Sequence, residues 1–192
     1  MIQIIGITLV LIFYVAYFLK LMNQKRRGIK TNQLGRGNKA AKTVIIESLL
    51  RISSTIIVVV ILVSALLNTS LVSNQITRGF GLVLLGCGTF LFIIAVVTMR
   101  DSWRAGIPDK DSTSMVTSGI YKISRNPAFL GFDLTYIGAS LAFGNIVLYI
   151  LAVLTILLMH LQILEEEKFL EITFNKEYLV YKNKVARYFL FL

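Results

Sequence analysis

The residues best suited to chemistry begin with a short polar group in the second half of the chain. Arg125, Asn126 and Pro127 end the polar segment 100–127 and stand directly before the apolar run "AFLGF". In a chain that is 56% hydrophobic, ionisable side chains so close to an apolar stretch are functional candidates. Pro127 suits the first turn of a helix, where backbone N–H groups point outward and can bind an anion. We therefore expect an anionic ligand near Arg125.

A second polar segment, residues 160–187, carries complementary groups. It opens with His160 and contains three consecutive glutamates, Glu165–Glu167. Carboxylates can accept hydrogen bonds from the amino and hydroxyl groups of a ligand, and a histidine can bind a ligand or move a proton. A simpler interpretation is that the glutamates only hydrate a helix end and that Arg125 extends its side chain to water.

Metal chemistry is not expected. Cys87 and His160 are the only cysteine and the only histidine. A single chain can therefore form neither a disulfide nor a cluster of soft metal ligands. Catalysis has to use arginine, carboxylates, tyrosine, this histidine and the backbone.

Membrane helices must position these groups. Mean hydropathy is +0.74 and only 16% of the residues are charged, against about a quarter in soluble domains. A spanning helix needs about 20 apolar residues. The sequence offers five such stretches, at about residues 2–22, 44–67, 79–99, 128–145 and 146–164. We expect an all-α, polytopic membrane protein with one domain, residues 1–192, whose successive parts are 1–43, 44–99 and 100–192.

The last two spans predict a helical hairpin, because only Gly144 and Asn145 separate them. The hairpin would place Arg125 at the start of one helix beside the glutamates at the end of the other. Beyond the glutamates, an apolar stripe with spacings of mostly three or four predicts an amphipathic C-terminal helix. Its members are Phe169, Leu170, Phe174, Tyr178, Tyr181, Val185 and Tyr188.

The placement of charge predicts the orientation. The formal charge is +10, and eight basic residues with no acidic one lie between Lys20 and Lys42. Basic loops remain on the cytoplasmic side of a membrane. We expect the N-terminus outside, and the basic loop, the segment before the fourth span and the C-terminal tail in the cytoplasm. A nucleic-acid partner is not expected, because a soluble fold normally surrounds such a basic surface.

Charged and small residues inside the spans are expected to be structural. Glu47 and Arg51, four residues apart, could form a salt link or reach the interface. Asp133 should lie near the head groups or face the protein interior. Small residues allow helices to pack closely. We expect this of Gly79, Gly81, Gly86 and Gly88.

Two motifs resemble one enzyme family. "VTSGIYKISRNPAFLG" (116–131) is similar to the V-x-x-G-x-Y-x-x-x-R-[HN]-P-x-[YF]-x-G motif of isoprenylcysteine carboxyl methyltransferases, relatives of the phospholipid N-methyltransferases. "EEKFLEITFNKEYLVYKNKVAR" (166–187) resembles the second signature of this family. The chain departs at Asn126, Phe129 and Asn175, where members carry His, Tyr or Gly.

This resemblance implies an integral membrane methyltransferase that uses S-adenosylmethionine at the cytoplasmic face. A carboxyl oxygen is the first implied acceptor atom, and an amine or a thiol stays open. The acceptor would be a lipophilic small molecule or a prenylated or lipid substrate reached from the membrane. The implied catalytic residues are Arg125, His160 and Glu167. The implied cofactor site contains Val116, Gly119, Tyr121, Arg125, Asn126, Pro127, Gly131, His160, Glu166, Glu167, Tyr178 and Tyr181.

Two other functions stay open from the sequence. Membrane sterol reductases resemble the chain in an Arg-x-Pro segment, and they use NADPH in place of S-adenosylmethionine. A non-catalytic adaptor could bind anionic lipid through the basic loop, residues 23–43.

Overall fold

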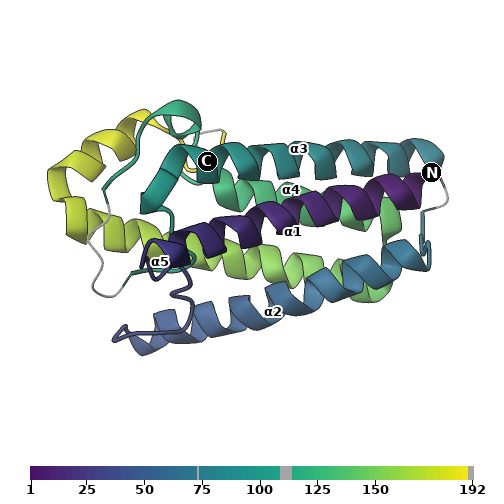
Figure 1. Ribbon diagram of the computed structural model, residues 1–192, viewed down its shortest axis with the longest axis horizontal. Helices are drawn as coiled ribbons and strands as arrows, with labels where there is room; N and C mark the ends of the chain where they lie inside the picture. Colours follow the sequence, from purple (N-terminus) through teal and green to yellow (C-terminus); the bar gives the residue numbers. More distant parts are fainter. Residues whose placement is uncertain (73, 109–113, 190–192) are drawn as a thin grey trace.

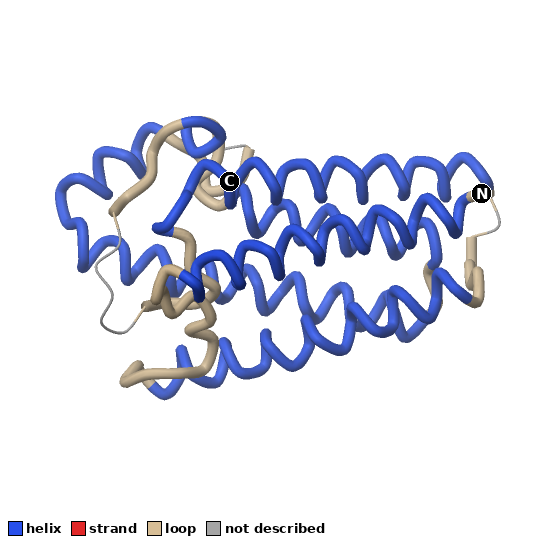
Figure 2. The backbone as a smooth tube through the Cα atoms, viewed as in Figure 1, coloured by secondary structure: helices blue, strands red, loops and turns tan. Residues whose placement is uncertain are grey.

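The computed structural model describes residues 1–72, 74–108 and 114–189 (Figures 1 and 2). Its helices are α1 (Ile2–Arg26), α2 (Ala41–Leu66), α3 (Gln75–Met99), α4 (Pro127–Phe143) and α5 (Ile146–Lys184), with short 3-10 helices at Arg100–Ser102 and Gly119–Lys122. The predicted all-α, polytopic fold is confirmed. α1, α2, α3 and α5 are long and apolar enough to span a membrane, whereas α4 has only 17 residues.

The short α4 is held against α3 by glycines. Gly81 and Gly88 on α3 face Gly138 and Gly131 on α4, and each pair is spaced by seven residues, about two turns. A Cβ atom at Gly88 would lie 2.6 Å from the Gly131 carbonyl oxygen. The two backbones are therefore in contact, as small residues allow, and the prediction for Gly81 and Gly88 is confirmed.

The other two glycines predicted to pack closely do not. A Cβ atom at Gly79 would meet nothing within 4 Å, and one at Gly86 would only reach Leu9 at 3.9 Å. Each lies two residues before a contact glycine, and two residues turn a side chain by about 200° around the helix axis. Gly79 and Gly86 therefore point away from α4, and the prediction for them is wrong.

The polar segments meet at one end of the bundle. The loop between α1 and α2, the segments on either side of Gly119 and the last turns of α5 lie together at the left of Figure 1. The N-terminus and the turn at Gly144 lie at the other end. The sequence predicts this meeting. That this end faces the cytoplasm stays a prediction from the charge placement.

The predicted hairpin is formed by α4 and the first part of α5, and the predicted C-terminal helix is the last part of α5. Asn145 Oδ1 accepts a hydrogen bond from the Leu148 N–H at 3.0 Å and so caps the helix directly after the turn. α4 nevertheless packs mainly on α3, and α5 packs mainly on α2. At Asn175 the backbone kinks, with φ 46° and ψ −120°. The last turns of α5 therefore fold back over the polar end of the bundle (Figure 1).

The basic loop is folded against the segment that follows α3. The Gln33 N–H donates to the Ala105 carbonyl at 2.8 Å, and the Ala105 N–H donates to the Thr31 carbonyl at 2.9 Å. The Gln24 side chain, at the end of α1, donates to the Trp103 carbonyl at 3.1 Å. The N-terminal part of the chain thus fixes the path of residues 103–105.

Glu47 is fully buried under this loop. Its carboxylate accepts from Lys39 Nζ at 2.6 Å, the Gly35 N–H at 2.8 Å and the Ile107 N–H at 2.9 Å. The predicted link from Glu47 to Arg51 is therefore wrong. A buried carboxylate needs several donors, and the folded loop supplies them, whereas the Arg51 side chain is exposed.

Candidate active site

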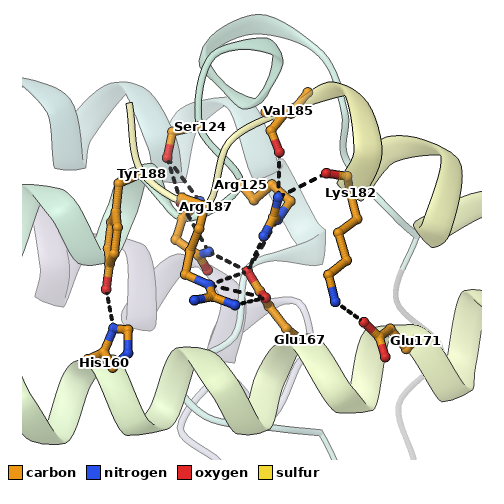
Figure 3. A network of polar contacts seen from close by, with 10 residues as sticks. Ser124, Arg125, His160, Glu167, Glu171, Lys182, Val185, Arg187 and Tyr188 are labelled. Atoms are coloured by element: carbon orange, nitrogen blue, oxygen red, sulfur yellow. Dashed lines mark hydrogen bonds and ion pairs between the residues drawn. The ribbon is translucent and has the colours of Figure 1, made fainter. Parts of the chain in front are cut away.

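Arg125 and Glu167 form the centre of the polar end (Figure 3). Arg125 Nη2 donates to Glu167 Oε1 at 2.9 Å, and Nε donates to the same oxygen at 3.2 Å. The exposed fractions of the two side chains are 7% and 5%. The start of α4 and the acidic stretch of α5 therefore share one site, as the sequence predicts. A pair this buried is stable only when further hydrogen bonds satisfy its atoms.

The C-terminal segment supplies those bonds. Arg187 Nη2 donates to Glu167 Oε2 at 3.0 Å. Arg125 Nη1 donates to the Lys182 carbonyl at 3.1 Å and also to the Val185 carbonyl. The hydrogen bond to Glu167 raises the pKa of Arg187 above its ordinary value. Because two guanidinium groups share one carboxylate, this cluster has one positive charge in excess.

The residues directly before α4 bind the same segment. Ser124 and Ala186 form an isolated parallel bridge, and the Ser124 hydroxyl donates to the Arg187 carbonyl at 3.2 Å. Asn126 Nδ2 lies 3.3 Å from both the Arg187 carbonyl and Glu167 Oε1. The tail is thus fastened to the entrance of α4 by backbone and side chain together.

His160 lies next to the tail. Its Nδ1 is 2.7 Å from the Tyr188 hydroxyl, and the two rings are stacked. Burial raises the pKa of Tyr188 to about 12, so its hydroxyl keeps its proton at neutral pH. Figure 3 shows this pair beside the Arg125–Glu167 pair.

A cleft of about 900 Å³, partly open to solvent, lies on the other side of Arg125. We call it the polar cleft. Seven predicted site residues line it: Val116, Tyr121, Arg125, Asn126, Glu166, Tyr178 and Tyr181. Its remaining walls come from the end of α3 and the segment after it, from Ala128 and Phe129 of α4, and from Phe169, Leu170 and Phe174 of α5. A cation, a carboxylate and aromatic rings therefore line this cleft.

The other five predicted site residues lie outside this lining: Gly119, Pro127, Gly131, His160 and Glu167. Pro127 occupies the first turn of α4, as predicted. Gly131 is in the contact with α3. Gly119 adopts φ 58°, a left-handed conformation that favours glycine. By position, these two glycines shape the backbone around the cleft.

The kink at Asn175 brings the end of α5 over the polar cleft. The Tyr181 hydroxyl donates to the Tyr121 carbonyl at 2.7 Å. Burial raises the pKa of Tyr121, so this ring stays neutral. Asn175 stands where the resembled family often has glycine. Its φ of 46° gives the reason, since glycine adopts positive φ without steric cost.

Three residues around the cleft are missed by the sequence analysis. Gln162 Nε2 donates to Glu166 Oε1 at 3.1 Å and to Glu47 Oε1 at 3.2 Å, so Glu166 is tied to α2. Gln162 precedes Glu166 by one helical turn, a spacing that could have indicated the contact. Arg187 is the last residue of the second motif, and this position could have indicated that it belongs to the site. No sequence pattern indicates Glu47, because its hydrogen-bond partners come from several separate segments.

A second cleft, of about 1580 Å³, lies between α1, α2 and α4. We call it the apolar cleft. Its walls include Leu11, Phe18, Val59, Phe132 and Tyr136, and the first three side chains are exposed on the outer surface of the bundle. It shares five lining residues with the polar cleft: Trp103, Arg104, Gly106, Ala128 and Phe129. The two clefts therefore adjoin along these residues.

Fold and site define an integral membrane protein with two adjoining clefts at the end of the bundle where the polar segments meet. The model of the phospholipid methyltransferase family matches residues 75–177, which is more than half of the chain. The chain belongs to this family and is a membrane methyltransferase. This confirms the resemblance and favours methyl transfer over the NADPH-dependent alternative. None of the curated proteins matches the chain.

Proposed function

We propose that the protein transfers a methyl group from S-adenosylmethionine in the polar cleft to a lipophilic or amphipathic acceptor in the apolar cleft. The observation that carries this proposal is the shared wall, because Trp103 and Phe129 line both clefts. A displacement at a methyl carbon needs donor and acceptor aligned and in contact. Because the two clefts adjoin along these shared residues, ligands bound in them would lie next to each other and could meet at the junction.

The polar cleft fits S-adenosylmethionine by the chemistry of its lining. The carboxylate of this cofactor requires a cation, which Arg125 and the positive excess shared with Arg187 provide. Its amino and ribose hydroxyl groups require acceptors, and the Glu166 carboxylate lines the cleft. The aromatic rings of α5 suit both an adenine and a cationic sulfur. When bound, the cofactor supplies a methyl group attached to positively charged sulfur.

The chain's own residues then hold the ligands in position and keep water out of the cleft. We assign Glu167 and Arg187 to positioning, because they act on the cleft through Arg125 and the tail. Tyr181 closes the cleft by its bond to the Tyr121 carbonyl. The basic loop beside the site supports a cytoplasmic location for the reaction.

The need for a base depends on the acceptor atom. A carboxylate, the first acceptor that the resemblance implies, is already an anion at neutral pH and needs no base. An amine has to lose a proton, and Glu166 is the carboxylate placed in the cleft to take it. His160 contacts Tyr188 outside the cleft lining, so we assign it to holding the tail.

The test is a labelling experiment with purified protein, methyl-labelled S-adenosylmethionine and a total lipid extract. We expect label in the organic phase. Treatment with base releases the label as methanol from a methyl ester and leaves an N-methyl product unchanged, so the same sample identifies the acceptor atom. Absence of labelled lipid together with absence of cofactor binding in calorimetry would overturn the proposal.

A further inference from the structure

The apolar cleft contains buried polar atoms that the proposed function does not use. In the part of the chain that the structure describes, the hydroxyl oxygens of Tyr14 and Tyr136 and the side-chain oxygen of Gln162 are buried and make no hydrogen bond of ordinary geometry. All three residues line the apolar cleft. Gln162 bonds Glu166 beside the polar cleft and so belongs to the site described above. The two tyrosines have no role so far.

Tyr14 of α1 and Tyr136 of α4 lie beside each other, deep in the bundle. The ring centroids of Phe13 and Phe132 are 4.8 Å apart, and the Tyr136 centroid is 6.0 Å from that of Phe132. Tyr136 follows Pro127, the first residue of α4, by nine residues, which puts it roughly 13 Å from the polar end. At such a depth a membrane offers no water to an unpaired hydroxyl.

The two hydroxyls cannot satisfy each other. Each tyrosine donates one hydrogen, so even a bond from Tyr14 to Tyr136 would use only one of the two O–H groups. The side chains near them in the cleft, among them Val10, Leu62 and Met159, offer no oxygen or nitrogen. At least one O–H donor therefore stays without an acceptor.

An unsatisfied donor of this kind is costly, and buried polar groups in proteins are almost always hydrogen-bonded. Phenylalanine would fill nearly the same space without this cost. Two tyrosines side by side in an apolar cleft therefore indicate that the missing acceptor belongs to a ligand. A charged acceptor is disfavoured so far from water, whereas a hydroxyl or carbonyl oxygen suits the site.

We propose that Tyr14 and Tyr136 form a subsite for an uncharged oxygen, a hydroxyl or a carbonyl, carried within the hydrocarbon part of the molecule that occupies the apolar cleft. This molecule is then an oxygenated lipophile, and plain hydrocarbon chains fit the cleft less well. The inference deepens the proposed function and rests on it only in taking this molecule as the methyl acceptor. The oxygen is separate from the group that is methylated, which has to lie at the junction with the polar cleft.

Trp103 offers a readout that needs no methyl transfer. It is the only tryptophan of the chain, it is 5% exposed, and it lines the apolar cleft. Bromine atoms on an acyl chain quench tryptophan at close range. The full chain in neutral detergent is loaded with methyl dibromostearate as an uncharged quencher. Three unbrominated esters then displace it in parallel titrations: methyl stearate, its derivative hydroxylated at mid-chain, and the isomer hydroxylated beside the ester group.

We expect the mid-chain hydroxy ester to restore the fluorescence at a concentration about fivefold lower than methyl stearate, since one hydrogen bond contributes at this level. The isomer carries the same hydroxyl near the ester, away from the tyrosines, and should show no such gain. It also controls for the lower lipophilicity that a hydroxyl brings.

The double variant Tyr14→Phe, Tyr136→Phe should lose this preference. Without ligand it should unfold at the same or a higher temperature than the wild type, because the removed hydroxyls have no partner in the chain. Tyr17→Phe is the matched control. Tyr17 lines the same cleft on the same helix, and its hydroxyl is not among the buried atoms that lack a partner. This variant should keep the preference.

Equal displacement by all three esters would overturn the inference, and so would a preference that survives the double variant or disappears in Tyr17→Phe. A double variant that unfolds at a lower temperature than the wild type would assign the hydroxyls to the fold and overturn it too. Cofactor binding is measured separately on the same sample. Its absence with an intact preference for the mid-chain hydroxyl would refute the proposed function alone, and the reverse result would refute this inference alone.

Discussion

Gln162 of α5 donates to Glu47 of α2 at 3.2 Å, directly below the carboxylate that lines the polar cleft. Through this bond the N-terminal half of the chain reaches the candidate cofactor site. Glu47 also holds the Ile107 N–H, in the segment that walls the polar cleft. A residue outside the family match is therefore bonded to the candidate active site.

Replacing Glu47 by Gln should weaken both folding and cofactor binding. Lys39, whose side chain is 6% exposed, loses its charged partner, and breaking a buried pair costs about 3–5 kcal/mol. Glu166 also loses the anchor of Gln162. We expect a lower midpoint of thermal unfolding in detergent and a weaker affinity for S-adenosylmethionine in calorimetry.

Arg78→Gln separates these two effects. Arg78 is also buried, and it donates to the Ala142 carbonyl at 2.8 Å at the opposite end of the bundle. We expect this variant to lower the unfolding midpoint and to keep the cofactor affinity. If the two variants lose affinity in proportion to their stability, Glu47 has only a structural role.

Arg187→Gln should reduce cofactor affinity about tenfold, because charge-assisted hydrogen bonds contribute about 1.5–3 kcal/mol. The variant leaves Glu167 to Arg125 alone and removes the positive excess beside the cleft. Arg187→Lys keeps the charge but not the paired N–H groups, so an intermediate affinity is expected. Lys184→Gln, an exposed cation three residues earlier, is the control and should bind normally. Normal binding by Arg187→Gln would remove this residue from the site.

The parts predictable from sequence depend on local patterns. The five helices follow from apolar length, and the Arg125–Glu167 pair follows from two polar segments that flank one hairpin. The partner of Glu47 depends on how the loop after α1 folds over α2, and no spacing in the sequence reports that path. The link from Glu47 to Arg51 was predicted from their opposite charges and their spacing. The buried Glu47 carboxylate instead needs several donors, and the loop supplies them.

Packing partners were equally hard to predict. Adjacent helices in a short hairpin are expected to pack together, yet α4 packs chiefly on α3, because glycines on both helices let their backbones touch. The stripe "GFGLVLLGCG" of residues 79–88 contains two pairs of glycines, each pair seven residues apart, and only Gly81 and Gly88 face the glycines of α4. Recognising that match requires reading both helices at once.

Gly88→Ala should destabilise the bundle, because the added methyl group would lie 2.6 Å from the Gly131 carbonyl oxygen. Overpacking of this kind costs about 1–3 kcal/mol. Gly79→Ala on the same helix meets no atom within 4 Å and should be neutral or stabilise by up to about 1 kcal/mol. Thermal unfolding of both variants in one detergent compares them directly. An unchanged midpoint for Gly88→Ala would contradict the close contact of α3 and α4.

Asn175→Gly should preserve cofactor binding and raise stability by about 1 kcal/mol, because glycine adopts the φ of 46° without steric cost. Asn175→Val should do the opposite, since a β-branched residue strongly disfavours positive φ. Straightening the kink would withdraw Tyr181 from the Tyr121 carbonyl and the Lys182 carbonyl from Arg125. Asn183→Val, at an exposed position beyond the kink, controls for the loss of an asparagine. Calorimetric affinities that fall for Asn175→Val and hold for the other two would tie the kink to the cleft, whereas equal affinities in all three would show that the end of α5 does not close over the ligand.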